Sequence, residues 1–273
     1  MTLTRRQLLQ LLDEHDVRPS RALGQNFVTD PNTVRRIARL AGVGPGDHVV
    51  EIGAGLGSLT LALAETGAAV TAVETDRHLV PLLREVVEPV GARVVEGDAT
   101  QVDWSGLLVD APAWTLVANL PYNVATPLVL DLLDHVPMIQ RMLVMVQREA
   151  GERLAAPVGH RAYGIPSVKV AYWARAEVVG RVPAAVFVPR PRVESVLVRI
   201  TRRDEPAVRA DPDLVFRLVR AAFGQRRKMV RRSLVSVVSA EQFERAGIAP
   251  ESRPEQLDIE AWGRLADAVS ARS

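Results

Sequence analysis

The sequence predicts an α/β protein with a mostly parallel sheet, followed by a small all-α C-terminal domain. Three observations support this prediction. Short apolar segments alternate with helical patterns through most of the 273 residues, as expected for a parallel sheet whose strands are connected by helices. A glycine-rich turn, Gly53 to Gly57, follows the first of these segments. Polar residues stand directly after the next segments, and beyond residue 204 only helical patterns remain.

The expected strands are short segments rich in valine and isoleucine, each of which leads into a turn or a polar residue. They comprise residues 49–52, 70–74, 93–96, 115–118 and 142–146. Residues 58–65 form a helix after the first strand, and Gly67 ends it. Asp76 is the expected cap of the next helix, although Pro81 requires that helix to start late or to bend. Residues 196–200 are expected to form a further strand.

The C-terminal part of the chain is expected to be a separate helical domain. Asp204-Glu205-Pro206 marks the boundary, which gives a first domain of residues 1–203 and a second of residues 204–273. Asp211-Pro212 has the order of a helix cap followed by a first-turn proline. Further helical patterns lie near Leu214, Arg231, Gln242 and Ile259.

The glycine turn is spaced for a nucleoside-containing cofactor. Gly53, Gly55 and Gly57 are closer together than the Gly-x-Gly-x-x-Gly of dinucleotide enzymes. This tighter spacing is typical of methyltransferases that bind S-adenosylmethionine. A glycine turn alone is a weak signal, so the residues at the neighbouring strand ends decide its interpretation.

Three polar side chains follow successive strands, where ligands of open parallel sheets bind. Glu74 ends the second strand and can accept both ribose hydroxyls, and Asp98 follows the third and can accept an adenine amino group. Asn119 follows the fourth. An acidic residue after a strand can also be only a helix cap, but the combination with the glycine turn favours a cofactor site.

The segment Asn119-Leu120-Pro121-Tyr122 carries the groups needed to recognise a planar ring with an exocyclic amine. The lone pair of such an amine is delocalised into the ring, so an enzyme that alkylates it must make the nitrogen more tetrahedral. The Asn119 side-chain oxygen and the Leu120 carbonyl can accept hydrogen bonds from it, because Pro121 favours an extended Leu120. Tyr122 can stack on the ring. The alternative is an ordinary strand-ending turn, in which Asn and Pro are common.

Composition excludes several other chemistries. The chain has no cysteine, which removes disulfides, cysteine-bound zinc and thiol nucleophiles and fits a cytoplasmic location. Its five histidines are scattered, and neither a Gly-x-Ser-x-Gly turn nor a P-loop occurs. We therefore expect no metal. The 20 uncharged residues from 111 to 130 include three prolines, so we expect buried sheet and loop there instead of a membrane span. No export signal is expected in the first 12 residues.

Charge is distributed unevenly along the chain. Residues 135–232 contain 20 Lys and Arg against 8 Asp and Glu, whereas the remainder contains 14 against 24, although the whole chain carries only +2. The densest segment is a predicted basic helix over residues 225–232, whose positive side chains are Arg226, Arg227, Lys228, Arg231 and Arg232. They are expected to be too dense for neutralisation by acidic neighbours, which predicts contacts with RNA phosphates. A solvated helix face is the alternative.

Taken together, these motifs resemble those of the bacterial small-subunit ribosomal RNA adenine-N6 dimethyltransferases, the KsgA family. The resemblance covers almost the whole chain, and it is carried by residues 23–27, 51–57, 119–123, 145–149, 187–195 and 222–228. It implies a Rossmann-like class I methyltransferase fold that uses S-adenosylmethionine. It also implies transfer of two methyl groups to each of two adjacent adenosines, in a hairpin loop near the 3′ end of small-subunit rRNA within the assembling 30S subunit.

The resemblance also implies roles for individual residues. By similarity the cofactor is bound or covered by Asn26, Val28, Gly53, Gly55, Glu74, Asp98 and Asn119. Tyr122 would stack on the adenine, and Phe187 would form the opposite wall unless it only fills a core edge. Residues 25–28 would form a lid over the methionine end of the cofactor, although such a segment can also be a plain linker. Val28 departs from the usual leucine, which a backbone contact tolerates.

Two other functions share these features. A large-subunit (23S) rRNA adenine-N6 methyltransferase of the macrolide-resistance type has the same glycine turn and an Asn-x-Pro-aromatic site. The basic segment at residues 225–232 favours the small-subunit enzymes. A nucleic-acid-binding assembly or transcription factor could use the same fold without chemistry, but the intact Asn119 and Tyr122 oppose this. We expect a monomer.

Overall fold

The computed structural model describes residues 2–20 and 23–271. The chain divides into two compact units. The sheet unit comprises Met1–Gly151 and Glu177–Thr201, and the helical unit comprises Glu152–Ala176 and Arg202–Ser273. Each is described by itself below.

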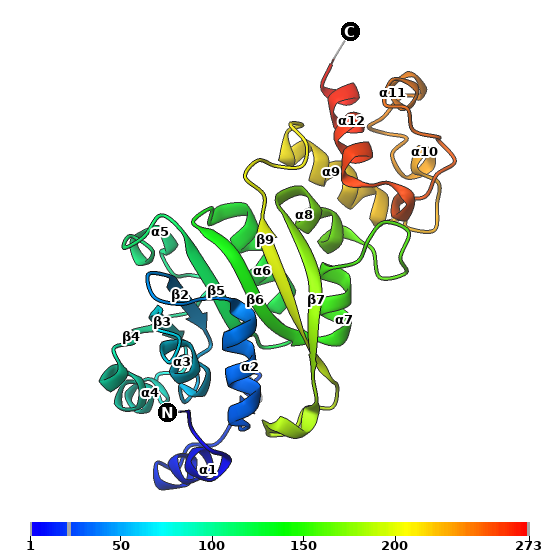
Figure 1. Ribbon diagram of the computed structural model, residues 1–273. Coiled ribbons are helices and arrows are strands. Elements are labelled where there is room, and N and C mark those ends of the chain that lie inside the picture. Colours follow the sequence, from blue (N-terminus) through cyan, green and yellow to red (C-terminus); the bar gives the residue numbers. More distant parts are fainter. Residues whose placement is uncertain (1, 21–22, 272–273) are drawn as a thin grey trace. The chain divides into compact units, whose positions relative to one another are not determined.

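The sheet unit is built on seven strands in the order β4-β3-β2-β5-β6-β9-β7 (Figure 1). The strands are β2 (His48–Ile52), β3 (Ala69–Glu74), β4 (Arg93–Glu96), β5 (Trp114–Asn119), β6 (Ile139–Gln147), β7 (Ala174–Val182) and β9 (Ser195–Arg202). Strands β2 to β6 pair in parallel, and β9 pairs antiparallel to β6. The predicted mostly parallel sheet is therefore confirmed. From β2 the chain adds β3 and then β4 on one side, and it then crosses back to place β5 on the opposite side of β2. The strand order therefore reverses between the adjacent strands β2 and β5.

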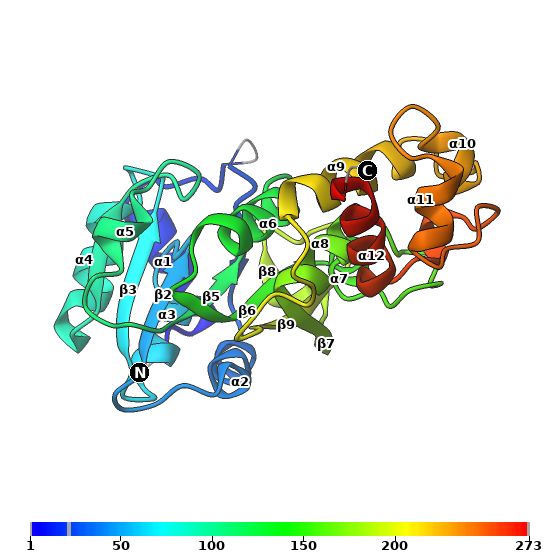
Figure 2. The ribbon, with the colours of Figure 1, turned by 90° about the horizontal axis from the view of Figure 1, so that it is seen from above.

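Helices lie on both sides of this sheet (Figures 1 and 2). The helices of this part of the chain are α1 (Arg5–Glu14), α2 (Pro31–Ala41), α3 (Ser58–Ala64), α4 (Val80–Val87), α5 (Trp104–Leu107), α6 (Ala125–His135) and α7 (Arg148–Leu154), with short 3-10 turns η1 (Glu88–Val90) and η2 (Ala184–Val186). Two further short strands, β1 (Phe27–Val28) and β8 (Phe187–Val188), pair antiparallel with each other.

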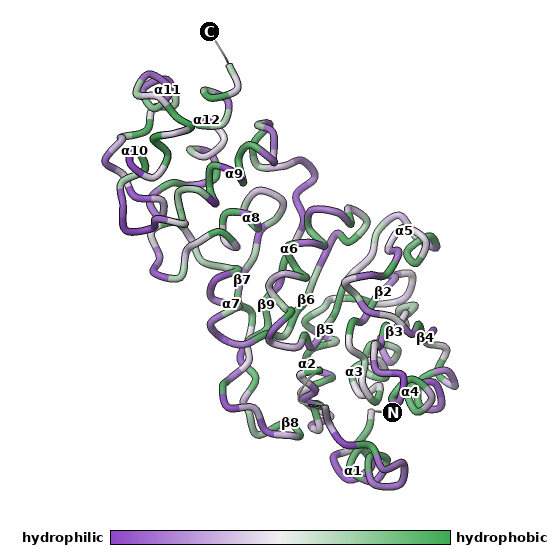
Figure 3. Tube along the Cα trace, turned by 180° about the vertical axis from the view of Figure 1, so that it is seen from behind, coloured by the Kyte–Doolittle hydropathy of each residue, from purple (hydrophilic) through white to green (hydrophobic). Residues whose placement is uncertain are grey.

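The core of the sheet unit follows from the alternation of side chains along each strand. Val49, Val70 and Val117 pack against apolar residues of α2, α3 and α4 in one buried cluster. The alternate residues, such as Val50 and Leu116, are also buried. Both faces of the sheet are thus covered, which explains why its strands are almost entirely apolar. The apolar character of β6 and β9 is visible in Figure 3.

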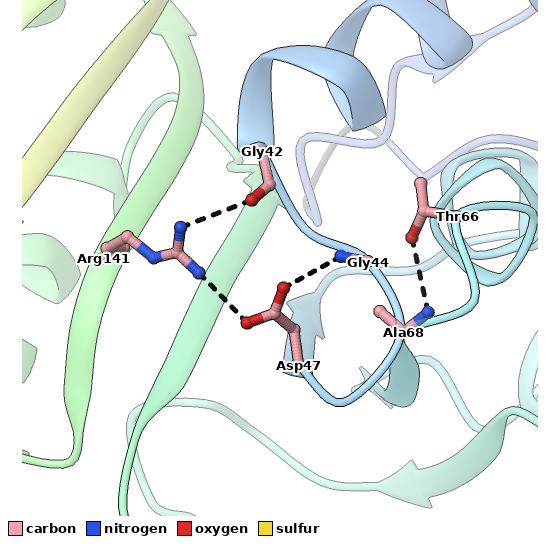
Figure 4. A network of polar contacts seen from close by, with 6 residues as sticks. All are labelled: Gly42, Gly44, Asp47, Thr66, Ala68 and Arg141. Carbon is pink, nitrogen blue, oxygen red and sulfur yellow. Dashed lines mark hydrogen bonds and ion pairs between the residues drawn. The ribbon is translucent and has the colours of Figure 1, made fainter.

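A polar network holds the ends of the strands opposite to those that carry the predicted site residues (Figure 4). Arg141 of β6 donates to the Gly42 carbonyl at 3.3 Å and contacts Asp47 at 3.4 Å. The other Asp47 oxygen accepts from the Gly44 N–H at 2.9 Å. These contacts tie the turn after α2 to a strand almost 100 residues later in the chain, at the end where β2 and β6 begin.

Local signals explain most helix ends. The side chain of Asp30 accepts from the amides of the first turn of α2, Pro31 stands in that turn, and Gly42 ends the helix in the left-handed conformation. Helix α4 begins at Val80 with Pro81 in its first turn, so the late start is confirmed. The expectation for Asp76 was wrong, because the residue at the N-cap of α4 is Leu79. The Asp76 carboxylate instead accepts from the His78 N–H, in the turn before the helix, and from the Gln25 side chain.

The helical unit has its own buried cluster. Its elements are α8 (Ile165–Trp173), α9 (Pro212–Phe223), α10 (Val230–Ser233), α11 (Ala240–Arg245), η3 (Pro254–Gln256) and α12 (Ile259–Ser270). Trp262 belongs to this cluster and is 0% exposed. Asp211 caps α9 as expected, through hydrogen bonds to Asp213 and Leu214 N–H.

The division into units differs from the expected boundary at residue 203, because residues 152–176 pack with the C-terminal helices. Tyr163 and Tyr172 are buried in the same cluster as Trp262. The Tyr172 hydroxyl donates to the Ala210 carbonyl at 2.9 Å. Such contacts join segments far apart in the sequence. A domain boundary predicted from local composition cannot take these contacts into account.

The prediction of a helix over residues 225–232 was wrong. Helix α9 ends at Phe223, residues 224–228 form turns, and α10 covers only Val230–Ser233. The Lys228 N–H donates to the Gln225 carbonyl at 2.7 Å, a turn contact three residues apart. The residues of the turn have no apolar stripe that a helix could bury, which is why a helix gains nothing there.

Candidate active site

The predicted site residues converge at one edge of the sheet. Ile52 at the end of β2 pairs with Val73 of β3 and with Ala118 of β5, all in parallel register. The glycine turn, Glu74 and Asn119 stand at the carboxyl ends of these three neighbouring strands. This is the edge at which ligands of open parallel sheets bind.

Two adjoining cavities, both partly open to solvent, lie at this edge. Both are lined by Leu23, Gly53, Thr75 and Pro121. The first is also lined by predicted site residues, namely Asn26, Val28, Gly55, Glu74, Asn119, Leu120 and Tyr122. The second is also lined by Asp98.

Glu74 is buried at the base of the first cavity, with 4% of its surface exposed. One carboxylate oxygen accepts from the Gly55 N–H at 2.7 Å, and the other accepts from the N–H groups of Thr75 and Asp76 at 3.0 and 2.9 Å. Burial raises the pKa of Glu74, whereas these three hydrogen bonds oppose the shift. The carboxylate is therefore fixed in place and oriented by the glycine turn itself.

The glycine turn needs glycine for its backbone shape and for space. Gly53, Gly55 and Gly57 have φ of 72°, 59° and 82°, in the left-handed region that favours glycine. A Cβ on Gly55 would lie 2.9 Å from the Phe27 ring. Because the N–H of this residue also donates to Glu74, the turn and the carboxylate depend on the same glycine.

Glu51 is a lining residue whose role was missed by the sequence reasoning. It is 2% exposed in the middle of an apolar strand, and it accepts a hydrogen bond from the Thr60 hydroxyl at 2.6 Å. Burial raises the pKa of Glu51 to about 8, opposed by the Thr60 hydrogen bond and reinforced by the charge of Glu74. An acidic residue inside an otherwise apolar strand was the available signal, because a carboxyl group is rarely buried without a specific role.

Asp98 lies at the rim of the second cavity. One of its oxygens accepts from the Thr100 N–H at 2.9 Å and from the Thr100 hydroxyl at 2.8 Å. These bonds fix the carboxylate after β4, on the side of the glycine turn where β3 and β4 lie. Asp98 and Glu74 thus line neighbouring parts of one extended site, joined by the residues that both cavities share.

A strap formed by residues 23–28 closes one side of the first cavity. The Asn119 amide nitrogen donates to the Asn26 carbonyl at 2.9 Å. Gln25 donates to Asp76 at 2.8 Å, and its side-chain oxygen accepts from the Ser20 N–H at 2.7 Å. The strap therefore contacts the ends of β5 and β3, and it orients the side chain of Asn119.

Leu120, Pro121 and Tyr122 continue the cavity wall beyond β5. Leu120 is 1% exposed, and its N–H donates to the Met145 carbonyl at 3.1 Å, which extends the pairing with β6 by one residue. The Tyr122 hydroxyl lies 3.1 Å from the hydroxyl of Ser195, at the start of β9. Ser195 is a second residue that the sequence reasoning missed, because nothing local indicates that it meets Tyr122.

Phe187 is not brought into the lining of either cavity. Its ring is 2% exposed and belongs to the core cluster that includes Val28 and Val34. In the β1–β8 pair it lies opposite Val28, which does line the first cavity. The core-edge alternative describes this position, and a role of Phe187 as the opposite wall for adenine stays a prediction.

The basic segment lies in the helical unit, and its five positive side chains are all exposed. Two of them have acidic neighbours: Arg226 lies 3.8 Å from Glu255, and Arg231 lies 3.0 Å from Glu251. The expectation that none would be neutralised locally was therefore wrong for these two. Arg227, Lys228 and Arg232 have no ion pair within the described parts of the chain.

Comparison with known proteins identifies the family. The sequence profile of the family described as Ribosomal RNA adenine dimethylase matches residues 18–270. The chain belongs to this family. It is a methyltransferase with the class I fold.

The curated relatives are similar over nearly their whole length. Three examples are each named Ribosomal RNA small subunit methyltransferase A. The relative from Kineococcus radiotolerans is 48% identical over 97% of this chain and 90% of its own length. The relative from Bifidobacterium longum is 47% identical over 93% and 89%, and that from Thermobifida fusca is 47% identical over 97% and 95%.

Solved structures share the fold. A dimethyladenosine transferase from Plasmodium falciparum has 24% identity and a TM-score of 0.75 over 86% of this chain and 94% of that one. The 23S rRNA methyltransferase ErmE has 25% identity and a TM-score of 0.70 over 89% and 99%. In the described residues, no helix is long and apolar enough to span a membrane, and no group of three or more metal-ligating side chains occurs.

Proposed function

We propose that this protein transfers methyl groups from S-adenosylmethionine to the N6 amines of two adjacent adenosines, in the hairpin loop near the 3′ end of small-subunit (16S) ribosomal RNA. Membership of the Ribosomal RNA adenine dimethylase family supports the chemistry. The relatives at 46–48% identity, all named for the small subunit, support the substrate. The likeness to a 23S enzyme at 25% identity is weaker support for a large-subunit substrate.

The observation that carries the proposal is the orientation of Asn119. Its amide nitrogen donates to the Asn26 carbonyl at 2.9 Å. Because the amide group is planar, its oxygen faces the other way, and no donor reaches this oxygen among the residues described. The site thus presents a hydrogen-bond acceptor at the end of β5, beside Tyr122, where a nucleophilic amine would need one.

The cavity also fits the proposed cofactor. The Ser58 hydroxyl is buried in its lining without a partner in the described chain, which indicates a polar ligand. Glu74 would accept from the ribose hydroxyls, Asp98 would accept from the adenine amino group, and the glycine turn would lie against the nucleoside. Asn26 and Val28 of the strap would cover the amino-acid end. When bound, the cofactor supplies an electrophilic methyl group on a sulfonium, whose leaving group is already activated.

The residues at the end of β5 would prepare the target base. The Asn119 oxygen and the Leu120 carbonyl would accept hydrogen bonds from N6, which favours a tetrahedral amine over a planar one. Tyr122 would stack on the adenine after it leaves the RNA stack. Each transfer forms one bond from N6 to carbon, breaks one from carbon to sulfur and releases one proton from N6. The protein contributes position and a polar, shielded pocket.

RNA would be held mainly through phosphates. Arg227, Lys228 and Arg232 supply unpaired positive charge in the helical unit, while Arg226 and Arg231 share theirs with acidic neighbours. In the sheet unit, Arg190 and Arg192 are exposed in the loop that leads to Ser195. We further propose that the substrate is the assembling 30S subunit, that the protein acts in the cytoplasm where assembly takes place, and that it acts as a monomer.

Mass spectrometry of ribosomal RNA tests the proposal. Small and large subunits from cells lacking this activity would be incubated separately with the protein and isotope-labelled S-adenosylmethionine. We expect two adjacent N6,N6-dimethyladenosines near the 3′ end of small-subunit rRNA, and none after the same treatment with Asn119→Ala. Label in large-subunit rRNA alone would favour the macrolide-resistance type of enzyme. Absence of label from both would favour a non-catalytic RNA-binding protein.

A further inference from the structure

The tyrosine that would receive the target adenine is itself held by a buried serine. Tyr122 lines the first cavity and is partly exposed, and its hydroxyl lies 3.1 Å from that of Ser195. Ser195 is 0% exposed. We propose that Ser195 is a positioning residue, which holds the Tyr122 ring through this hydrogen bond in the orientation that captures the target base. The inference rests on the proposed function, because it assigns a role within base capture.

The topology explains why these two side chains meet. Tyr122 stands three residues beyond the end of β5, and Ser195 is the first residue of β9. Strand β6 lies between them: Asn119 of β5 pairs with Met145, and Ser195 pairs with Gln147. Because β9 runs antiparallel to β6, its first residue lies at the same edge where β5 ends. Tyr122 therefore reaches past the end of β6 to a residue that begins a strand.

A fixed ring captures a base more readily than a mobile one. Pro121 restricts the backbone before Tyr122, but the ring can still rotate about its two side-chain torsions. Each stacking event would then have to immobilise the ring, which lowers the affinity for the base. The hydrogen bond to Ser195 fixes the ring in advance. Ser195 is a firm anchor because it is buried in the β6–β9 pairing.

The competing explanation is that Tyr122 only supplies a partner for a buried hydroxyl. Buried hydroxyl groups need a hydrogen bond, and the Tyr122 hydroxyl provides one at 3.1 Å. In that case the pair would contribute to stability and would have no effect on the base. The two explanations differ in what happens to base capture in a folded variant, so base capture is the quantity to measure.

A double-mutant cycle makes this measurement. The full-length variants are Ser195→Ala, Tyr122→Phe and the double variant, and Tyr122→Phe keeps the stacking ring. The probe is small-subunit RNA with 2-aminopurine at one target adenosine, which lacks the N6 amine and changes its fluorescence when it leaves the stack. We expect each single variant to lower the equilibrium for base capture by roughly 2- to 10-fold, the effect of one lost neutral hydrogen bond. The double variant should lose no more than either single variant, because both changes remove the same bond.

Ser167→Ala is the matched control. Ser167 is also a buried serine, 3% exposed, and its hydroxyl donates to the Arg153 carbonyl at 2.6 Å in the helical unit. This variant should capture the base as the unmodified protein does. Wild-type capture by Ser195→Ala, or losses that add in the double variant, would overturn the inference.

Two further outcomes are also decisive. If Ser195→Ala does not fold, Tyr122→Phe decides alone, and unchanged capture by that variant contradicts the positioning role. If the unmodified protein leaves small-subunit rRNA without label in the mass-spectrometric assay, the proposed function fails, and the inference fails with it. The two failures are thus distinguishable.

Discussion

The buried carboxyl of Glu51 should make the stability of the sheet unit depend on pH. Burial raises its pKa from the ordinary 4.5 to about 8. Between these two values the folded protein keeps a proton that the unfolded chain has released. The free energy of unfolding therefore falls as the pH rises from 4.5 to about 8, and it levels off above that. At ~1.4 kcal/mol per pH unit the loss is ~5 kcal/mol, a large share of the total stability of a typical domain.

Glu51→Gln isolates this effect. Glutamine does not ionise, and its side-chain oxygen can still accept from the Thr60 hydroxyl, which the Glu51 carboxylate meets at 2.6 Å. We expect the variant to match the unmodified protein near pH 4.5 and to exceed its stability by up to ~5 kcal/mol at about pH 9. Because both side chains can accept the bond from Thr60, we expect the difference to report the cost of ionising a buried carboxyl.

The difference in the free energy of unfolding between the two proteins is measured by urea unfolding at several pH values. Hydrogen exchange of the amides in β2 and β3 is the readout. Exchange is the suitable observable because it reports on the sheet unit separately from the helical unit. Glu96→Gln is the control, since Glu96 is exposed at the end of strand β4, which pairs with β3. It should not change the pH dependence. Parallel pH profiles for Glu51→Gln and the unmodified protein would refute the reasoning.

Three further predictions concern binding and catalysis. Glu74→Ala should weaken S-adenosylmethionine binding by roughly 10- to 150-fold in calorimetry, because hydrogen bonds to a charged group are lost. RNA binding should barely change. Unaltered cofactor affinity in the folded variant would remove Glu74 from the site. Asn119→Ala should lose most turnover while RNA stays bound, because the side-chain oxygen of Asn119 acts on the reacting amine. Near-normal methylation in a single-turnover assay would exclude that role. Replacing Arg227, Lys228 and Arg232 together by alanine should lower the salt-dependence slope of RNA binding by about 2–3 units, if each contacts one phosphate. Replacing Arg226 and Arg231, which have acidic neighbours, should lower the slope less. Equal decreases in the slope for the triple and the double variant would contradict the assignment of the phosphate contacts to the unpaired residues.

Local patterns in the sequence were sufficient for six of the seven strands of the sheet and for the edge that carries the site, whereas β7 (Ala174–Val182) was not predicted. The segments predicted as strands became β2 to β6 and β9, with ends that differ by a few residues. An apolar β-strand is visible in four or five consecutive residues, and a glycine turn needs only its own spacing. Glu74 and Asn119 could be placed at one edge because the carboxyl ends of parallel strands lie together. The composition of each segment therefore determined both the fold class and the neighbourhood of the site.

Local patterns failed where the outcome depended on what a segment packs against. Residues 224–228 carry charges that suit a helix surface, but they offer no apolar face to bury and form turns. Residues 152–176 look continuous with the sheet region, yet Tyr172 is buried against the C-terminal helices. In both cases the deciding free energy comes from burial against distant residues, which the local sequence does not contain.

The amino-acid sequence by itself thus determined which groups the site contains, whereas only the tertiary structure decided how they are held. The strap orients Asn119 through a carbonyl 93 residues earlier in the chain. Ser195 meets Tyr122 across 73 residues, because an antiparallel strand happens to begin where a parallel one ends. The burial that raises the pKa of Glu51 comes from the elements packed around β2. Each of these depends on distances between residues remote in sequence, and such distances exist only after the chain has folded.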